Sequence, residues 1–202
     1  MLRVGVLASG SGTNLQALLD QVHGREARIV AVGSDKPEAR ALERARAAGV
    51  PTRTFPPADY PDRPTRDRAI ADWLEEQGVE LVVLAGYMAI LDAAVVRRFA
   101  DRMINVHPSL LPAFPGIRAV EQALDYGVKV FGVTVHFVDE GVDTGPIILQ
   151  DSVCLPEAAT VDEVMAALRP IEHRLLPEAV RLIAAGRVRR DPDHPRRVLV
   201  DR

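Results

Sequence analysis

The stretch LRVGVLASGSGTNLQALLDQV, residues Leu2–Val22, decides the fold of this chain. Its beginning, Leu2–Ala8, is a short apolar run that is typical of a buried parallel strand. A glycine-rich turn follows, and the apolar residues after the turn recur at helical spacing. A strand, a tight turn and a helix in this order predict the first half of a strand–helix–strand unit, from which parallel sheets are built.

The same alternation continues outward from this stretch. We expect further strands at 28–34, 51–55, 80–86 and 102–106, with helices at 37–49, 63–77 and 92–100. This pattern predicts an α/β fold with a doubly wound, mostly parallel sheet and right-handed crossovers. After Pro115 the pattern changes to a helix at 118–126 and strands at 130–138 and 147–153. The short loop between these two strands predicts an antiparallel pair, so the sheet is expected to be mixed.

The last long helix is expected at 160–185. Thr160 and Glu163 have the spacing of a capping box, and Pro170 is expected to kink or divide the helix. We expect a single catalytic domain over residues 1–188. The polar segment 189–202 is expected to be a poorly ordered tail.

Composition excludes several classes of protein. The chain has 202 residues and a net charge of −3, from 25 basic and 28 acidic residues, which provides no basic surface for nucleic acid or an anionic membrane. No apolar run is long enough to cross a bilayer, so we expect a soluble, cytoplasmic protein with small-molecule partners. The single cysteine, Cys154, excludes an intrachain disulfide and is expected to be buried in a strand.

The turn ASGSGTN, Ala8–Asn14, lies where an open parallel sheet presents its ligands. Glycine lets the backbone approach an anion, and the following helix offers free N–H groups. A dinucleotide fingerprint would need glycine in place of Leu15, and a P-loop would need a lysine that is absent here. The turn therefore predicts a site for a single phosphate group, with Thr13 and Asn14 as side-chain donors. The alternative is a glycine-rich turn that binds nothing.

The stretch INVHPSLLP, Ile104–Pro112, places Asn105 and His107 at the end of an expected strand. Their spacing puts both side chains on one face, and Pro108 keeps His107 in extended geometry. An amide and an imidazole together can stabilise an oxyanion, and histidine can transfer a proton. A structural histidine is the alternative. Asn105 favours a functional site, because a buried amide costs free energy unless it is hydrogen-bonded.

A carboxylate beside His107 would orient its ring and favour its protonated form. The loop DEGVDTGP offers Asp139, Glu140 and Asp143, and spacing alone does not choose among them. His136 is a further candidate partner, although it lies in an alternating strand and could serve only to cover one face.

Five segments of the chain, taken in order, resemble the phosphoribosylglycinamide formyltransferase family. They are GSGTNLQAL, VVLAGYMAIL, INVHPSLLPAFPG, GVTVHFVDEGVDTGPIILQ and EHRLLP, and the resemblance extends over about residues 2–188. It implies a Rossmann-like fold and transfer of the formyl group of 10-formyltetrahydrofolate to a glycinamide ribonucleotide in purine biosynthesis. It implies no metal, and it leaves a monomer or a homodimer open.

The resemblance also implies roles for single residues. Asn105 and His107 would stabilise the oxyanion, and Asp143 would orient His107 and raise its pKa. The ribonucleotide would bind to Gly12, Thr13, Asn14 and Glu172. The folate would lie against Arg63, Met88, Ala89, Ile90, Leu91, Asn105, Asp139, Glu140, Gly141 and Val142.

The chain departs from the family pattern at two places. Family members often carry arginine in the stretch Met88–Leu91, where this chain has Ala89, and polar residues other than proline where it has Arg169 and Pro170. Two related enzymes share the catalytic block, namely methionyl-tRNA formyltransferase and formyltetrahydrofolate deformylase. A non-catalytic nucleotide-binding module and a metal hydrolase built on His107, His136 and Asp143 are the remaining alternatives.

Overall fold

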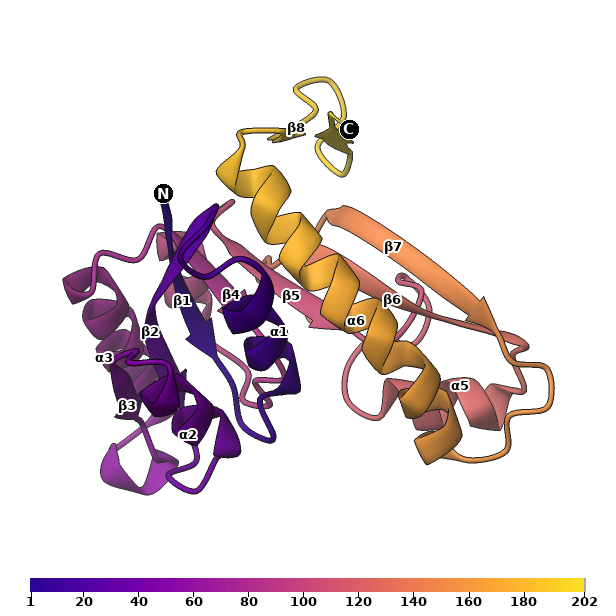
Figure 1. Cartoon of the computed structure of the whole chain (residues 1–202), viewed down its shortest axis with the longest axis horizontal. Helices are drawn as coiled ribbons and strands as arrows, with labels where there is room; N and C mark the ends of the chain where they lie inside the picture. The colour runs from indigo at the N-terminus through magenta and orange to yellow at the C-terminus, as the bar shows by residue number, and fades with distance from the viewer. Residues whose placement is uncertain (202) are drawn as a thin grey trace. The chain divides into compact units, whose positions relative to one another are not determined.

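The computed structural model describes residues 1–201, and Arg202 lies outside the described part. The chain divides into two compact units, Met1–Asn105 and Val106–Arg202. Seven strands form a sheet in the order β3-β2-β1-β4-β5-β6-β7 (Figure 1). The predicted α/β fold with a mostly parallel, mixed sheet is therefore confirmed. The predicted domain boundary at residue 188 stays a prediction.

The first unit consists of parallel strands with helices between them. Its strands are β1 (Leu2–Leu7), β2 (Ala27–Ser34), β3 (Thr52–Thr54) and β4 (Leu81–Leu84), and it includes the start of β5 (Met103–His107). Its helices are α1 (Thr13–Gln21), α2 (Arg40–Ala47), α3 (Arg63–Glu76) and α4 (Ala93–Arg98), with a 3-10 turn at Pro57–Asp59.

The strand order of this unit reverses between β1 and β4. The chain moves outward from β1 to β3 and then returns to β4 and β5. Right-handed crossovers therefore place α1 and α2 on one face of the sheet and α3 and α4 on the other. In agreement, α1 packs against α2, and α3 packs against α4. The connections after β1 and β4 run in opposite directions, and in open α/β sheets the carboxyl ends of two such strands are where ligands commonly bind.

The second unit is built around an antiparallel pair and one long helix. It contains α5 (Ala119–Tyr126), β6 (Val130–Phe137), β7 (Ile147–Cys154) and α6 (Val161–Ala184). The antiparallel pairing of β6 with β7 was predicted and is confirmed. Helix α6 packs against both strands and against α5. The predicted capping box is also present, with Thr160 and Glu163 exchanging side-chain and backbone hydrogen bonds.

Three expectations for the second unit were wrong. The expected division of helix α6 at Pro170 does not occur, because the helix continues through Pro170 and through a second proline, Pro177. Packing on β6 and β7 holds the helix together, although each proline removes one backbone hydrogen bond. An antiparallel ribbon is formed by β8 (Val188–Arg190) and β9 (Val198–Val200), and β9 contacts β7, so the segment expected to be a poorly ordered tail contains regular structure. Cys154, expected to be buried, is exposed at the end of β7.

No helix within residues 1–201 has both the length and the apolar character needed to cross a bilayer.

Candidate functional site

The turn between β1 and α1 contains a glycine that no other residue can replace without strain. Gly12 has a φ of 70°, in the left-handed region, and it is the N-cap of α1. A Cβ atom at this position would lie 2.6 Å from the Cα of Ala41 on α2. Both the backbone conformation and the packing of the two helices therefore require glycine here.

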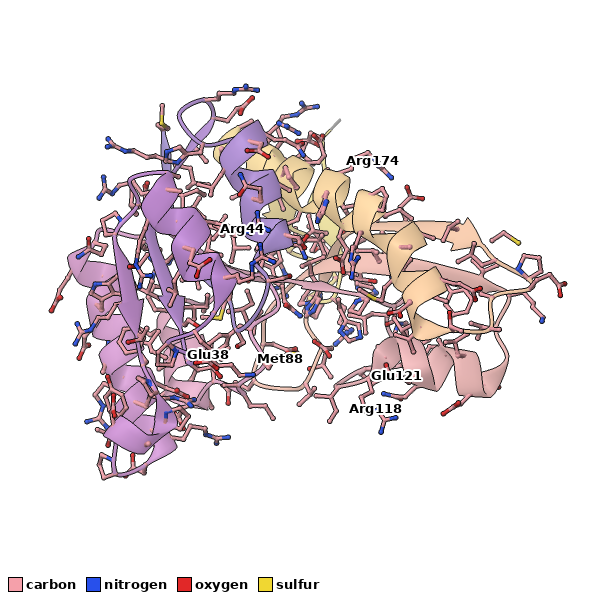
Figure 2. The ribbon with its side chains drawn as sticks, turned by 60° about the horizontal axis from the view of Figure 1, so that its bottom comes forward. Glu38, Arg44, Met88, Arg118, Glu121 and Arg174 are labelled. Carbon is pink, nitrogen blue, oxygen red and sulfur yellow. The ribbon has the colours of Figure 1, made fainter. Side chains whose placement is uncertain are left out.

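Main-chain carbonyls of the same turn accept hydrogen bonds from α2. The N–H of Ala41 donates to the Gly10 carbonyl at 3.1 Å, and the Arg44 guanidinium donates to the Ser11 carbonyl at 2.8 Å. Figure 2 labels Arg44 on this helix. No side chain caps the start of α1, and a Cβ atom at Gly10 would meet no atom within 4 Å. The turn is thus a fixed frame whose helix start is open to an anion.

The other residues expected in this unit lie near the ends of β4 and α3. Met88, Ala89, Ile90 and Leu91 form an irregular segment after β4, in which Met88 and Ile90 are exposed. Arg63 is the first residue of α3 and is also exposed. None of these side chains is sequestered in the core, so all remain accessible for binding.

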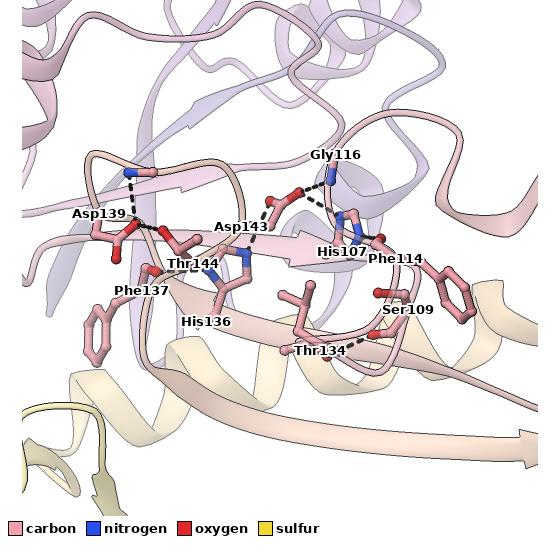
Figure 3. A network of polar contacts seen from close by, with 12 residues as sticks. His107, Ser109, Phe114, Gly116, Thr134, His136, Phe137, Asp139, Asp143 and Thr144 are labelled. Atoms are coloured by element: carbon pink, nitrogen blue, oxygen red, sulfur yellow. Dashed lines mark hydrogen bonds and ion pairs between the residues drawn. The ribbon is translucent and has the colours of Figure 1, made fainter. Parts of the chain in front are cut away.

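In the second unit, the structure brings His107 and Asp143 together (Figure 3). His107 is the last residue of β5 and is 5% exposed, and its Nδ1 lies 3.3 Å from Oδ2 of Asp143. Oδ2 also accepts a hydrogen bond from the backbone N–H of Gly116 at 2.7 Å. Of the three acidic residues that the sequence left open, Asp143 is therefore the one beside His107.

Asp139 and the residues after it have a different place in this loop. Oδ1 of Asp139 accepts hydrogen bonds from the Gly141 N–H at 3.1 Å and the Thr144 hydroxyl at 2.6 Å. Glu140, Gly141 and Val142 are exposed. Asp139 therefore holds the loop in shape, while the residues at its tip remain available to a ligand.

Asp143 has a second histidine neighbour, His136, to which the sequence alone assigned no definite role. His136 is 2% exposed, and its Nε2 lies 3.5 Å from Oδ1 of Asp143. Its Nδ1 lies 2.8 Å from the Phe137 carbonyl. Of the two possibilities left open for His136, a polar partner or a residue that only covers one face of its strand, the structure therefore supports the first, with Asp143 as its neighbour. The sequence signal for a role of His136 was its position in an apolar run, which predicts burial. A buried imidazole requires hydrogen-bond partners.

The neighbours of Asp143 keep it ionised. Burial by itself would raise its pKa, but hydrogen bonds from His136 and Gly116, and the positive field of His107, together hold the pKa of Asp143 below its ordinary value. The cluster therefore places a charged carboxylate between two imidazoles.

Both ring nitrogens of His107 face acceptors. Nδ1 faces Asp143, and Nε2 lies 2.9 Å from the Phe114 carbonyl. Because a carbonyl accepts and does not donate a hydrogen bond, Nε2 is the donor in the contact with Phe114. His107 thus has a proton on Nε2 for a substrate only where the bond to Phe114 is exchanged for one to the substrate.

The loop that follows His107 is held by Thr134 of β6, which is fully buried. The Thr134 hydroxyl donates to the Ser109 carbonyl at 2.7 Å and accepts from the Leu111 N–H at 3.1 Å. It also accepts from the Gln150 side chain at 2.9 Å. The prolines of this loop predicted stiffness, but this anchor was not predicted.

Glu172 lies on α6 and is buried, whereas Arg169 and Pro170, one turn earlier, are exposed. Burial, with a smaller contribution from the charge of Arg169, lowers the pKa of the neighbouring His173. Arg169 and Pro170, the second departure from the family pattern, are thus on the accessible side of α6. Within residues 1–201, no group of three or more histidine, cysteine or acidic side chains is arranged to hold a metal ion.

Comparison with known proteins relates this geometry to a family. Residues 2–180 match the family described as formyl transferase. The phosphoribosylglycinamide formyltransferase of Bacillus subtilis is 40% identical over 183 residues, which are 90% of this chain and 94% of that protein. The glycinamide ribonucleotide transformylase 1 of Symbiobacterium toebii has a solved structure that superposes with a TM-score of 0.93 at 50% identity, covering 99% of this chain and 94% of that one.

A longer relative is the trifunctional purine biosynthetic protein adenosine-3 of Bos taurus. It is 46% identical over 189 residues, and the match covers 93% of this chain but 19% of that protein. This chain therefore spans about a fifth of the length of the trifunctional relative and nearly all of the bacterial ones. The family match and these identities show that the chain belongs to the formyl transferase family.

Proposed function

We propose that this chain transfers the formyl group of 10-formyltetrahydrofolate to the amine of N1-(5-phospho-D-ribosyl)glycinamide, a step of purine biosynthesis. The observation that carries the proposal is the buried contact of His107 with Asp143, in a chain that belongs to the formyl transferase family. The relatives named for this reaction cover almost the whole chain, which supports the same substrates here.

The phosphate of the ribonucleotide would bind at the start of α1. Gly12, Thr13 and Asn14 would surround it, because the helix start carries no side-chain cap and its positive dipole end attracts an anion. Glu172 would contact the ribose or the glycinamide through its carboxylate. The fixed turn on α2 supports this assignment, since the frame needs no rearrangement to receive a phosphate.

The folate would lie against Arg63, the segment 88–91, Asn105 and the loop residues 139–142. The side chain of Ala89 is too short to donate a hydrogen bond, so contacts from this segment would come from its backbone. Within the described chain, the N–H groups of Ala89, Ile90 and Leu91 donate to no protein atom. They are available to the polar edge of a bound ring.

The reaction would be a direct displacement. The substrate amine attacks the formyl carbon, a C–N bond forms, and the carbonyl oxygen becomes an oxyanion held by Asn105 and His107. The bond from this carbon to the folate nitrogen then breaks. The attacking amine loses a proton and the departing folate nitrogen gains one, so charge and atoms balance. No covalent enzyme intermediate is required.

Asp143 and His136 would prepare His107 for this role. Strand β5 passes through both Asn105 and His107, whose spacing puts them on one face. Binding of the formyl oxygen would replace the Phe114 carbonyl as the partner of His107 Nε2. Hydrogen bonds at active sites often reach their catalytic geometry only in the complex, so this exchange agrees with the structure without ligands.

The decisive experiment mixes the purified protein with 10-formyltetrahydrofolate, with and without the ribonucleotide. Formation of the formylated ribonucleotide with no free formate supports the proposal. Release of formate without the amine would instead indicate the deformylase, and transfer only to charged initiator tRNA would indicate the tRNA enzyme. Binding of ribonucleotide without turnover would indicate the non-catalytic module, and activity lost on chelation would indicate the metal hydrolase.

The cytoplasmic location and the monomeric or homodimeric state stay predictions. Sedimentation of the purified chain, with and without both substrates, measures the second directly.

A further inference from the structure

The segment 88–91 is exposed, yet a buried side chain holds it at each end. At its start, the N–H of Met88 donates to the Ser9 hydroxyl at 2.9 Å. Beyond its end, the N–H of Asp92 donates to Oδ2 of Asp67 at 2.7 Å. Ser9 is 4% exposed and Asp67 is fully buried, so water does not compete for these two acceptors.

A charged partner fixes each of these acceptors. The Ser9 hydroxyl donates to Oδ1 of Asp35 at 2.5 Å, so its lone pairs are directed toward Met88. Asp67 receives two hydrogen bonds at its Oδ1 from Arg66, at 2.7 and 2.9 Å, which leaves Oδ2 for Asp92. Each anchor is therefore a pair of side chains, and both pairs lie in the first unit.

Between the anchors, the backbone N–H groups make no hydrogen bond to another described residue. Residues 89–91 also have no regular secondary structure. The turn that supplies Ser9 is by contrast held by its own main chain, since Ser9 N–H donates to the Gly86 carbonyl at 3.0 Å. Removing the Ser9 hydroxyl would therefore free Met88 more than it would disturb the phosphate turn.

We propose that Ser9 and Asp67 are positioning residues that hold the backbone of segment 88–91 in the conformation that binds folate. The inference rests on the proposed function, which places the folate against this segment. It also explains how the segment can serve without a long polar side chain at position 89. Contacts made by a backbone need that backbone to be fixed, and the two buried anchors fix it.

The first test is the substitution Ser9→Ala. The loss of one hydrogen bond of this kind predicts roughly a 2- to 10-fold weaker binding of tetrahydrofolate, measured by calorimetry without the second substrate. The dissociation constant of the ribonucleotide should change less. Ser9→Thr, which keeps the hydroxyl, should restore most of the folate affinity. Thr160→Ala serves as the control, because it removes a side-chain bond to a backbone N–H far along the chain in α6.

The second test isolates the Asp67 anchor. Asp92 has a φ of −66°, which proline shares, so Asp92→Pro removes the donor N–H without straining φ. Asp92→Ala keeps the N–H and loses the same N-cap side chain. Weaker tetrahydrofolate binding by the proline variant than by the alanine variant supports the anchor.

Equal folate affinity in wild type, Ser9→Ala and Asp92→Pro would overturn the inference. Because binding of tetrahydrofolate needs no turnover, this result is distinct from failure of the proposed function. That failure would appear as a wild-type protein that binds folate and formylates no ribonucleotide. Hydrogen exchange at residues 86–92 gives a second readout, since each substitution that loosens the segment should speed exchange there.

Discussion

The turn Ala8–Asn14 of the first unit and the His107–Asp143–His136 cluster of the second differ in the kind of groups that they present. The turn presents main-chain groups, and its critical residue, Gly12, has no side chain. The cluster presents three side chains whose charges and hydrogen bonds depend on one another. Substitutions should therefore damage the turn by changing the backbone and the cluster by changing chemistry, and the two kinds of damage are separable by experiment.

The largest expected effect is on the chemistry of the cluster. His107→Ala removes an oxyanion donor and should lower kcat by roughly 100- to 1000-fold, with the fold intact, and Asn105→Ala should do the same. Steady-state kinetics and circular dichroism measure both quantities. His194→Ala, in the exposed ribbon loop, is the control and should stay near wild type. Near-wild-type turnover of His107→Ala would remove His107 from the mechanism.

His136→Leu should have the next largest effect. It removes a buried partner of Asp143, and the loss of a hydrogen bond to a charged group predicts a fall in kcat of roughly 10- to 100-fold. His136→Gln keeps an amide donor and should recover part of the rate. His23→Leu is the matched control, because its ring likewise hydrogen-bonds the backbone, accepting from the Ile29 N–H at 3.0 Å, in the other unit. Equal kinetics in the His136 and His23 variants would show that His136 is structural.

Substitutions in the turn Ala8–Asn14 should change the stability of the protein and its affinity for the ribonucleotide. In Gly12→Ala, alanine must adopt a positive φ, and its Cβ would clash with Ala41. The substitution should therefore lower the free energy of unfolding by about 1–3 kcal/mol. Gly10→Ala meets no protein atom and should leave stability unchanged. A raised KM for the ribonucleotide in Gly10→Ala would show that the ligand itself approaches this position. Denaturant titration separates the two variants, and equal stability would contradict the packing argument.

The smallest expected effect is the pH dependence of stability. Because the pKa of Asp143 is lowered in the folded protein, its stabilising contribution is complete above the unfolded value of about 3.9 and is lost as the pH falls through the folded value. The difference in unfolding free energy between wild type and Asp143→Asn should shrink as the pH falls below about 4. A difference that grows as the pH falls from about 4 to 2 would reverse the sign of this argument.

The sequence predicted the sheet because apolar runs, glycine turns and helical spacing are local signals. It also predicted that Asn105 and His107 share one strand face. It did not choose Asp143 over Asp139 and Glu140, because that choice depends on how the loop folds back on Gly116. The family resemblance made the choice, and the structure shows the contact.

His136 and the C-terminal ribbon show the limits of local signals. His136 alternates in its strand like any buried residue, and only its contact with Asp143 distinguishes it. The ribbon is polar, which predicts disorder, but β9 packs on β7, and Arg196 donates to the Thr144 carbonyl at 2.7 Å. Both depend on partners distant in sequence, which a periodic pattern does not contain.

The bond between His107 Nε2 and the Phe114 carbonyl has a consequence for inhibitor design. A compound that fills the proposed folate position and leaves this bond in place would bind a form of the enzyme in which Nε2 of His107 is already paired with a carbonyl. Such a compound would not need to imitate the tetrahedral intermediate. Its selectivity would depend on the loop around Phe114, whose φ of 53° gives the backbone a shape that a rigid scaffold can match.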